Sequence, residues 1–187
     1  PMVDVQLNFD AGSRRDPADQ AGLASAAAMM ASKGVKAQGS APALDENAVG
    51  EAWADLGASF GAGASSDALT FSLRSLTDGS LLGRAADLAA RQMAQPSWPQ
   101  EVWLRERARW SAAIQESNTR PGVVAGRSFT RLVYSGHPYG MRTTEQTLAQ
   151  IQLQDMQALH ARSFQACRAK VSVVGAVNRT QADSLVQ

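Results

Sequence analysis

The chain has 187 residues, of which 44% are hydrophobic and 19% are charged, and its formal net charge at pH 7 is +1. A chain of this length buries about 70% of its unfolded surface on folding, so it needs neither a disulfide nor a metal to hold a core together. The composition excludes a disordered tail, the charge gives no electrostatic case for nucleic-acid binding, and no run approaches the roughly 18 to 20 apolar residues that cross a bilayer.

Secondary structure can be predicted along most of the chain. Alternating apolar and polar residues predict a strand over 3–8, and an alanine-rich helix follows that begins at Asp19 or Gln20 and ends at Gly34. Few strands and segregated helices favour an α+β fold, with a largely antiparallel sheet packed against helices. A loop over 35–42 and a helix over 45–56 are predicted next, followed by strands over 59–64 and 69–76. A helix that ends before Pro96 and two further helices over 99–117 and 121–134 come after these strands. The last predicted elements are a helix beginning at 145, a helix around Met156 and Leu159, and a buried strand over 170–176.

The residue types that usually carry catalysis are scarce and scattered. Cys167 has no second cysteine to pair with and is predicted to be a small buried hydrophobe. His137 lies in an H-P-Y-G loop and His160 on a helix, which is not a recognisable zinc pattern. The arginines and glutamates over 101–109 alternate and predict a solvated helix face. No catalytic constellation therefore supports an unrelated α+β enzyme.

The alanine-rich helix carries the most informative pattern. Residues 21–34 read A-G-L-A-S-A-A-A-M-M-A-S-K-G, which resembles the metal helix of M16 zinc peptidases, G-L-A-H-x-x-E-H-M-x-x-K-G. In that pattern two histidines bind zinc and the glutamate activates water. Here Ser25, Ala28 and Met29 stand at those three positions. A hydroxyl is a poor zinc ligand, alanine has no acid or base, and a thioether suits softer metals, so this helix is predicted to be scaffold only.

The resemblance covers nearly the whole chain and includes a second loss. The third zinc ligand of the family is a glutamate on a later helix, and the position that corresponds to it here is Ala113, seven residues after Glu106. Its neighbour Ala112 also lacks a carboxylate. The resemblance therefore implies no catalytic residue and no metal ligand in this chain. The matching pieces are 3–16, L-G-A-S-F-G-A at 56–62, D-A-L-T-F-S-L at 67–73, R-E-R-A-R at 105–109, H-P-Y-G at 137–140 and V-V-G-A-V at 173–177.

What the family does implies a role for this chain. Residues 1–187 would form a single N-terminal M16 half-domain of a non-catalytic subunit in a heteromeric M16B-like zinc metallopeptidase, with the homologous C-terminal half outside this sequence. A homologous subunit with an intact H-x-x-E-H would bind the zinc and cleave peptides in a shared chamber. The alternative is a structural or interaction module derived from an M16 peptidase, with no role in proteolysis.

The family also implies a place for the peptide substrate. Ser59, Phe60, Gly61 and Ala62 match an edge strand on which family members add the substrate as a further strand. Close packing in a hairpin explains the same small residues equally well.

Because Pro1 is not an initiator methionine, we expect an upstream piece with an export signal. The sequence leaves the compartment open between periplasm and cytoplasm, with the periplasm slightly favoured.

Overall fold

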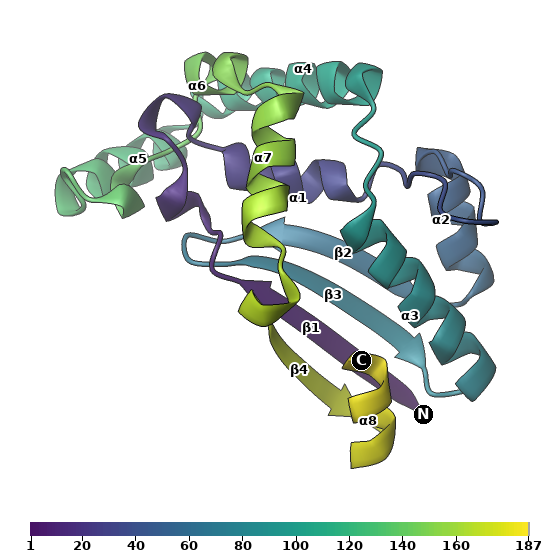
Figure 1. Ribbon diagram of the computed structural model, residues 1–187. Coiled ribbons are helices and arrows are strands. Elements are labelled where there is room, and N and C mark those ends of the chain that lie inside the picture. The colour runs from purple at the N-terminus through teal and green to yellow at the C-terminus, as the bar shows by residue number, and fades with distance from the viewer. Residues whose placement is uncertain (187) are drawn as a thin grey trace.

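The computed structural model describes residues 1–186 and places helices against one face of a single β-sheet (Figure 1). The predicted α+β class is confirmed. The sheet is antiparallel throughout, with the strand order β2-β3-β1-β4. The strands are β1 (Met2–Phe9), β2 (Ser59–Ala64), β3 (Leu69–Leu76) and β4 (Lys170–Gly175). The helices are α1 (Leu23–Ala31), α2 (Glu46–Asp55), α3 (Gly79–Ala94), α4 (Gln100–Ser117), α5 (Pro121–Val133), α6 (Glu145–Gln150), α7 (Leu153–Ser163) and α8 (Arg179–Val186).

The first strand lies in the middle of the sheet. Val5 of β1 pairs with Leu73 of β3 on one side and with Val173 of β4 on the other. Alternation along β1 buries Val3 and Val5 beneath the helices and leaves Asp4 on the outer, polar face. β2 and β4 are therefore the two edges of the sheet.

The core contains a stack of aromatic rings between the sheet and its helices. Phe60 of β2 stacks on Trp53 of α2 at 5.4 Å and on Phe71 of β3 at 5.8 Å between ring centroids. The buried indole of Trp53 donates its Nε1–H to Oε1 of Gln92 on α3 at 2.8 Å. This hydrogen bond satisfies two buried polar groups and ties α2 to α3 over the sheet.

The alanine-rich helix begins later than the sequence predicts. Residues 18–20 form a separate 3-10 turn, and α1 starts only at Leu23, after Gly22 adopts a positive φ of 112°. A Cβ at Gly22 would lie 2.6 Å from Thr143 Oγ1, so glycine is required there both for its backbone angle and for space. The predictions of an N-terminus at Asp19 or Gln20 are wrong because this glycine interrupts the helical path.

Two burial predictions are also wrong. The last strand was predicted to be buried, but β4 is a sheet edge, and Val174 on its outer face is 70% exposed. Cys167 lies in a 3-10 turn before β4 and is exposed rather than buried. The error at β4 arises because a short apolar run does not distinguish a central strand from an edge strand. The error at Cys167 arises because the residue type alone does not report that the residue lies in an exposed turn. No helix within residues 1–186 is long and apolar enough to cross a membrane.

Candidate functional site

The candidate site is built around α1, which lies between the sheet and the other helices. Seven of its nine residues are buried, and the two that are only half-buried are Ser25 and Met29. These two residues are four apart and so share one face of the helix, whereas Ala28 is 2% exposed. The face that the family pattern assigns to the metal is therefore the most open face of α1.

A buried carboxylate holds the start of α1 in place. Asp16 accepts hydrogen bonds from the backbone N–H groups of Gly22 at 2.9 Å and Ala24 at 3.0 Å. These contacts satisfy backbone donors that a helix N-terminus otherwise leaves unpaired. Burial raises the pKa of the Asp16 carboxyl, and the hydrogen bonds from the backbone of Gly22 and Ala24 oppose that rise.

An ion-pair network holds the other end of the helix. Lys33, just after α1, donates to Glu46 of α2 at 2.5 Å and lies 3.6 Å from Glu106 of α4. Arg105 donates to both carboxylates, at 2.6 Å to Glu46 and 2.8 Å to Glu106. The side chain of Glu106 is only 8% exposed, so the prediction that it belongs to a solvated face is wrong. The network joins α1, α2 and α4 at one point.

The charges in this network set the protonation of its carboxyls. The hydrogen bond from Arg105, with the nearby Lys33 and Arg109 charges, lowers the pKa of Glu106 against the opposing effect of burial. The hydrogen bonds from Lys33 and then Arg105 lower the pKa of Glu46 in the same way. Both carboxyls are therefore ionised at neutral pH and carry structural ion pairs rather than a free acid or base.

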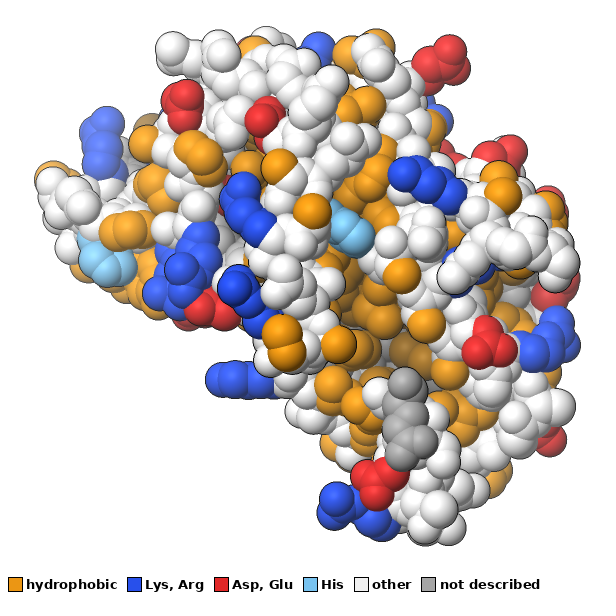
Figure 2. All heavy atoms as spheres, viewed as in Figure 1, with side chains coloured by type: hydrophobic (Ala, Val, Ile, Leu, Met, Phe, Trp, Pro, Cys, Tyr) orange, Lys and Arg blue, Asp and Glu red, His pale blue; other side chains and the backbone are white. Residues whose placement is uncertain are grey.

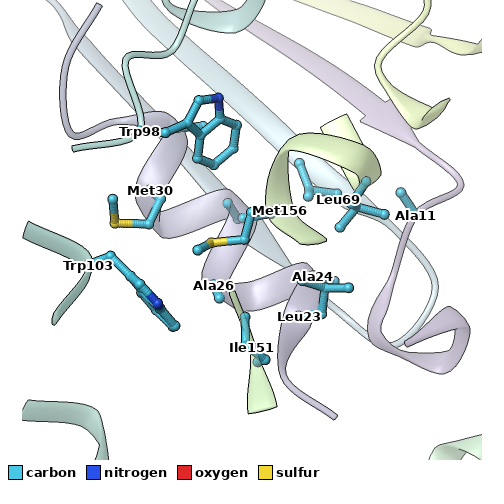
Figure 3. Close-up of a cluster of buried hydrophobic side chains, with 14 of the residues drawn as sticks. Ala11, Leu23, Ala24, Ala26, Met30, Leu69, Trp98, Trp103, Ile151 and Met156 are labelled. Carbon is cyan, nitrogen blue, oxygen red and sulfur yellow. The ribbon is translucent and has the colours of Figure 1, made fainter. Parts of the chain in front are cut away.

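The position predicted for the third zinc ligand lies on α4. Ala113 and Ala112 are exposed there, while Ile114 and Trp110 are half-buried and pack against the core that contains α1. Nearer the N-terminus of α4, Trp103 is buried in that core. Figure 3 shows its ring pointing toward α1 on the side of Met30 and Ala26. Trp103, Trp110 and Ile114 thus attach α4 to the core that contains α1, and at the predicted position of the third ligand α4 carries an exposed methyl group.

The predicted peptide-binding residues lie on a free sheet edge. β2 pairs with β3 on one side, in the register Phe60 to Leu73 and Gly61 to Ser72, and among residues 1–186 no strand lies on its other side. Phe60 and Ala62 face the core, whereas Ser59 and Gly61 face the outer surface. α1 packs against β2, so the open edge and the candidate helix are neighbours.

The side chains at the candidate positions do not fit a zinc ion. Peptidase zinc takes imidazole nitrogens and carboxylate oxygens, whereas Ser25, Met29 and Ala113 offer a hydroxyl, a thioether and a methyl group. Within residues 1–186, no group of three or more His, Cys, Asp or Glu side chains is placed to hold a metal ion.

The two histidines make local contacts instead. His160 Nε2 lies 2.6 Å from the carbonyl oxygen of Met93 and joins α7 to α3, and His137 Nδ1 accepts from the backbone N–H of Tyr139 at 3.2 Å.

Sequence reasoning missed the contacts that hold α1. Asp16 stands six residues before Gly22, outside the usual N-cap distance, so no local capping pattern marks it. The partners of Lys33 are 13 and 73 residues away in sequence, which no local pattern reports.

Comparisons with known proteins agree on one family. The sequence pattern of the insulinase family, peptidase family M16, matches residues 1–147. The inactive domain of an M16 peptidase from Pseudomonas fluorescens is 28% identical over 100% of this chain and 44% of that one, with a TM-score of 0.90. A protease from Helicobacter pylori is 20% identical over 99% of this chain and 44% of that one, with a TM-score of 0.84.

More distant structures share the fold. Pitrilysin is 20% identical over 98% of this chain and 20% of its own, with a TM-score of 0.76. The present chain thus spans less than half the length of these proteins. A search of curated proteins finds no match.

Proposed function

Because the chain belongs to the insulinase family of peptidases, family M16, we propose that it is a non-catalytic half-domain that pairs with a homologous subunit bearing H-x-x-E-H. The pair would form a heteromeric M16B-like zinc metallopeptidase, with the zinc and the water-activating glutamate in the partner. The present chain would close the chamber around the peptide, and the C-terminal half of its own polypeptide would contribute to the same enclosure.

One observation carries this proposal: the backbone of α1 is held in place at both ends as a metal-binding helix would need, but its side chains cannot bind zinc. Asp16 anchors its start, Lys33 anchors its end, and its open face is formed by the two positions at which the family has histidines. Keeping the nine residues of α1 in this position does not support catalysis when the open face carries Ser25 and Met29. It is useful in a subunit whose folded shape an active partner needs.

A relative supports the same direction. The Pseudomonas fluorescens structure, which is similar over the entire chain, is described as an inactive domain of an M16 peptidase. That description concerns the other protein. It indicates that the family contains half-domains whose fold persists without activity, and we extend that condition to this chain on the strength of Ser25, Ala28, Met29 and Ala113.

The edge strand β2 gives the chain a part in substrate binding. An extended peptide can add to β2 as a fifth strand through backbone hydrogen bonds, which tolerate many side chains. Gly61 leaves open space on the outer face, since a Cβ there would meet only Ser72 Oγ, at 3.9 Å. The neighbouring α1 would then present Ser25 and Met29 to the peptide as contact surface and not as catalysts.

Capture of the full-length protein from its native extract tests this function. We expect a stoichiometric homologue with H-x-x-E-H among the captured proteins, identified by mass spectrometry, and peptide cleavage that a zinc chelator abolishes. Recovery of the chain alone, or with a membrane assembly and without peptidase activity, would instead support the structural module with no role in proteolysis.

A further inference from the structure

Three arginines line a hollow between the end of α4, helix α5 and the segment 140–142. The basic residues are Arg127, Arg131 and Arg142, and we call the space that they line the arginine hollow. Its volume is about 710 Å³, and Val123 and Val124 supply apolar wall. Clefts that bind ligands occupy roughly 300–1,000 Å³, so the arginine hollow accommodates a group larger than a single inorganic anion.

The positive charge of the arginine hollow is not neutralised by ion pairs. Within residues 1–186, none of its three arginines pairs with a carboxylate. The acidic residues on either side in sequence have other partners: Glu116 pairs with Arg120, and Glu145 accepts a hydrogen bond from Gln115 at 2.5 Å. Because a guanidinium is always charged in a protein, the arginine hollow favours an anionic ligand.

One of the three guanidinium groups is held in position. Arg127 is half-buried and donates to Asn118 Oδ1 and to Ser117 Oγ at the end of α4. Both acceptors are neutral, so these hydrogen bonds orient the guanidinium without cancelling its charge. Arg131 and Arg142 are exposed and can adjust to a ligand. Figure 2 shows basic and hydrophobic side chains together over α5, at the left of the molecule.

The arginine hollow borders the candidate site around α1. Asn118, which lines the hollow, follows Ala113 by five residues at the end of α4, which is about 7.5 Å along the helix axis. On the other side, the segment 140–142 leads into Thr143, which packs so closely against Gly22 that a Cβ there would lie 2.6 Å from its hydroxyl. The arginines therefore lie beside the N-terminal end of α1.

We propose that the arginine hollow binds aspartate or glutamate side chains of the peptide in the chamber, so that this chain selects acidic peptides. The inference rests on the proposed function, which places the peptide beside α1. Guanidinium groups bind carboxylates through paired, charge-assisted hydrogen bonds, and the valine wall suits the aliphatic part of a glutamate. A nucleic acid is disfavoured, because it needs an extended basic surface and the net charge of the chain is only +1.

The test measures peptide binding by the full-length protein without its partner subunit, so that any segment outside residues 1–187 that covers the arginine hollow is in place. One fluorescent peptide carries glutamates, and its matched control carries glutamines at the same positions. We expect the glutamate peptide to bind about tenfold or more tightly in fluorescence anisotropy, and to weaken between about 50 and 300 mM salt. Because no cleavage is measured, failure of this binding and failure of the peptidase partnership are distinguishable.

Variants assign the binding to the arginine hollow. Arg131→Gln with Arg142→Gln should weaken binding of the glutamate peptide about tenfold or more and leave the glutamine peptide unchanged, because two unpaired charges are removed. Arg120→Gln with Arg179→Gln is the matched control, since it removes the same charge from arginines that are paired with carboxylates outside the hollow. Thermal melting of each variant separates lost binding from lost folding.

Three results would overturn the proposal. Equal affinity for the two peptides would show that carboxylates are not recognised. Equal losses in the Arg131 and Arg142 variant and in its control would show an effect of net charge alone. Protection of Arg131 and Arg142 from phenylglyoxal in the full-length protein without peptide, measured by mass spectrometry, would assign the arginine hollow to an acidic segment of the same polypeptide.

Discussion

Ser25 and Met29 stand one helical turn apart on the one side of α1 that is not buried. In the family pattern these positions hold the two histidines that bind zinc, and a ligand pair four residues apart reaches a common ion. Here the hydroxyl and the thioether share the same face, and both residues are half-buried. The absence of catalysis that we propose for this chain thus rests on these side chains, while the helix that carries them is retained.

Restoring the helix alone should not restore the metal site. The triple variant Ser25→His, Ala28→Glu and Met29→His supplies two imidazoles and a base, but α4 still lacks its carboxylate at Ala113. We expect no stoichiometric zinc by elemental analysis of the folded protein and no hydrolysis of a peptide substrate. Adding Ala113→Glu should raise the zinc content, whereas adding Ala112→Glu in its place should not. Zinc-dependent hydrolysis by the triple variant would contradict the assignment of Ala113.

The anchor at the start of α1 should matter for stability. Asp16→Ala leaves the N–H groups of Gly22 and Ala24 without their acceptor, so we expect a loss of about 1–2 kcal/mol in the free energy of unfolding by urea at pH 7. Asp16→Asn keeps one acceptor oxygen and should lose less. An Asp16→Ala variant as stable as the parent would show that the cap is not needed.

The same carboxyl predicts a pH dependence. Because burial raises the pKa of Asp16 in the folded state above its unfolded value of about 3.9, the folded protein takes up this proton first as the pH falls. The additional stability that comes from this proton uptake is full below the unfolded pKa and is lost as the pH rises through the folded pKa, whereas the hydrogen bonds from Gly22 and Ala24 are already present at pH 7. The parent should therefore gain stability relative to Asp16→Asn between pH 7 and pH 4. A constant difference would contradict the raised pKa.

The Glu106 network should respond to pH in the opposite direction. The pKa of Glu106 is lowered in the folded state, first by its hydrogen bond from Arg105, so its contribution is present above the unfolded value of about 4.3 and is lost as the pH falls through the folded pKa. We expect Glu106→Gln to cost about 1–3 kcal/mol at pH 7, measured by urea unfolding, and much less at pH 3. Glu51→Gln, at an exposed position of α2, serves as the control and should change little.

The sequence predicted the helices and strands better than it predicted the contacts that hold them together. The strand over 3–8 and the helices over 45–56 and 121–134 follow from local patterns, and the structure confirms them. Contacts between segments distant in sequence have no local signature, and Lys33 with Glu106 is an example. The sequence also did not show that the apolar side of α5, with Phe129, Leu132 and Val133, is exposed, because periodicity reveals an apolar side but not whether it faces the core or water.

The edge strand should be testable in the assembled peptidase. Gly61→Lys places a charged side chain on the free edge, which discourages the addition of a further strand, and the space around Gly61 accepts a side chain without a clash. We expect a higher KM for peptide cleavage by the complex with little change in kcat. Ser72→Lys is the matched control, because Ser72 pairs with Gly61 on the same face but lies on the interior strand β3. Equal effects of both substitutions would point to charge alone and not to the edge.

The most direct measurement is hydrolysis of a peptide library by the purified full-length protein, alone and after addition of its H-x-x-E-H homologue, with zinc content measured in each sample. If this chain is the non-catalytic member of the pair, the protein alone carries no stoichiometric zinc and cleaves nothing, while the mixture cleaves and a chelator stops it. Chelator-sensitive cleavage by the protein alone would contradict the account.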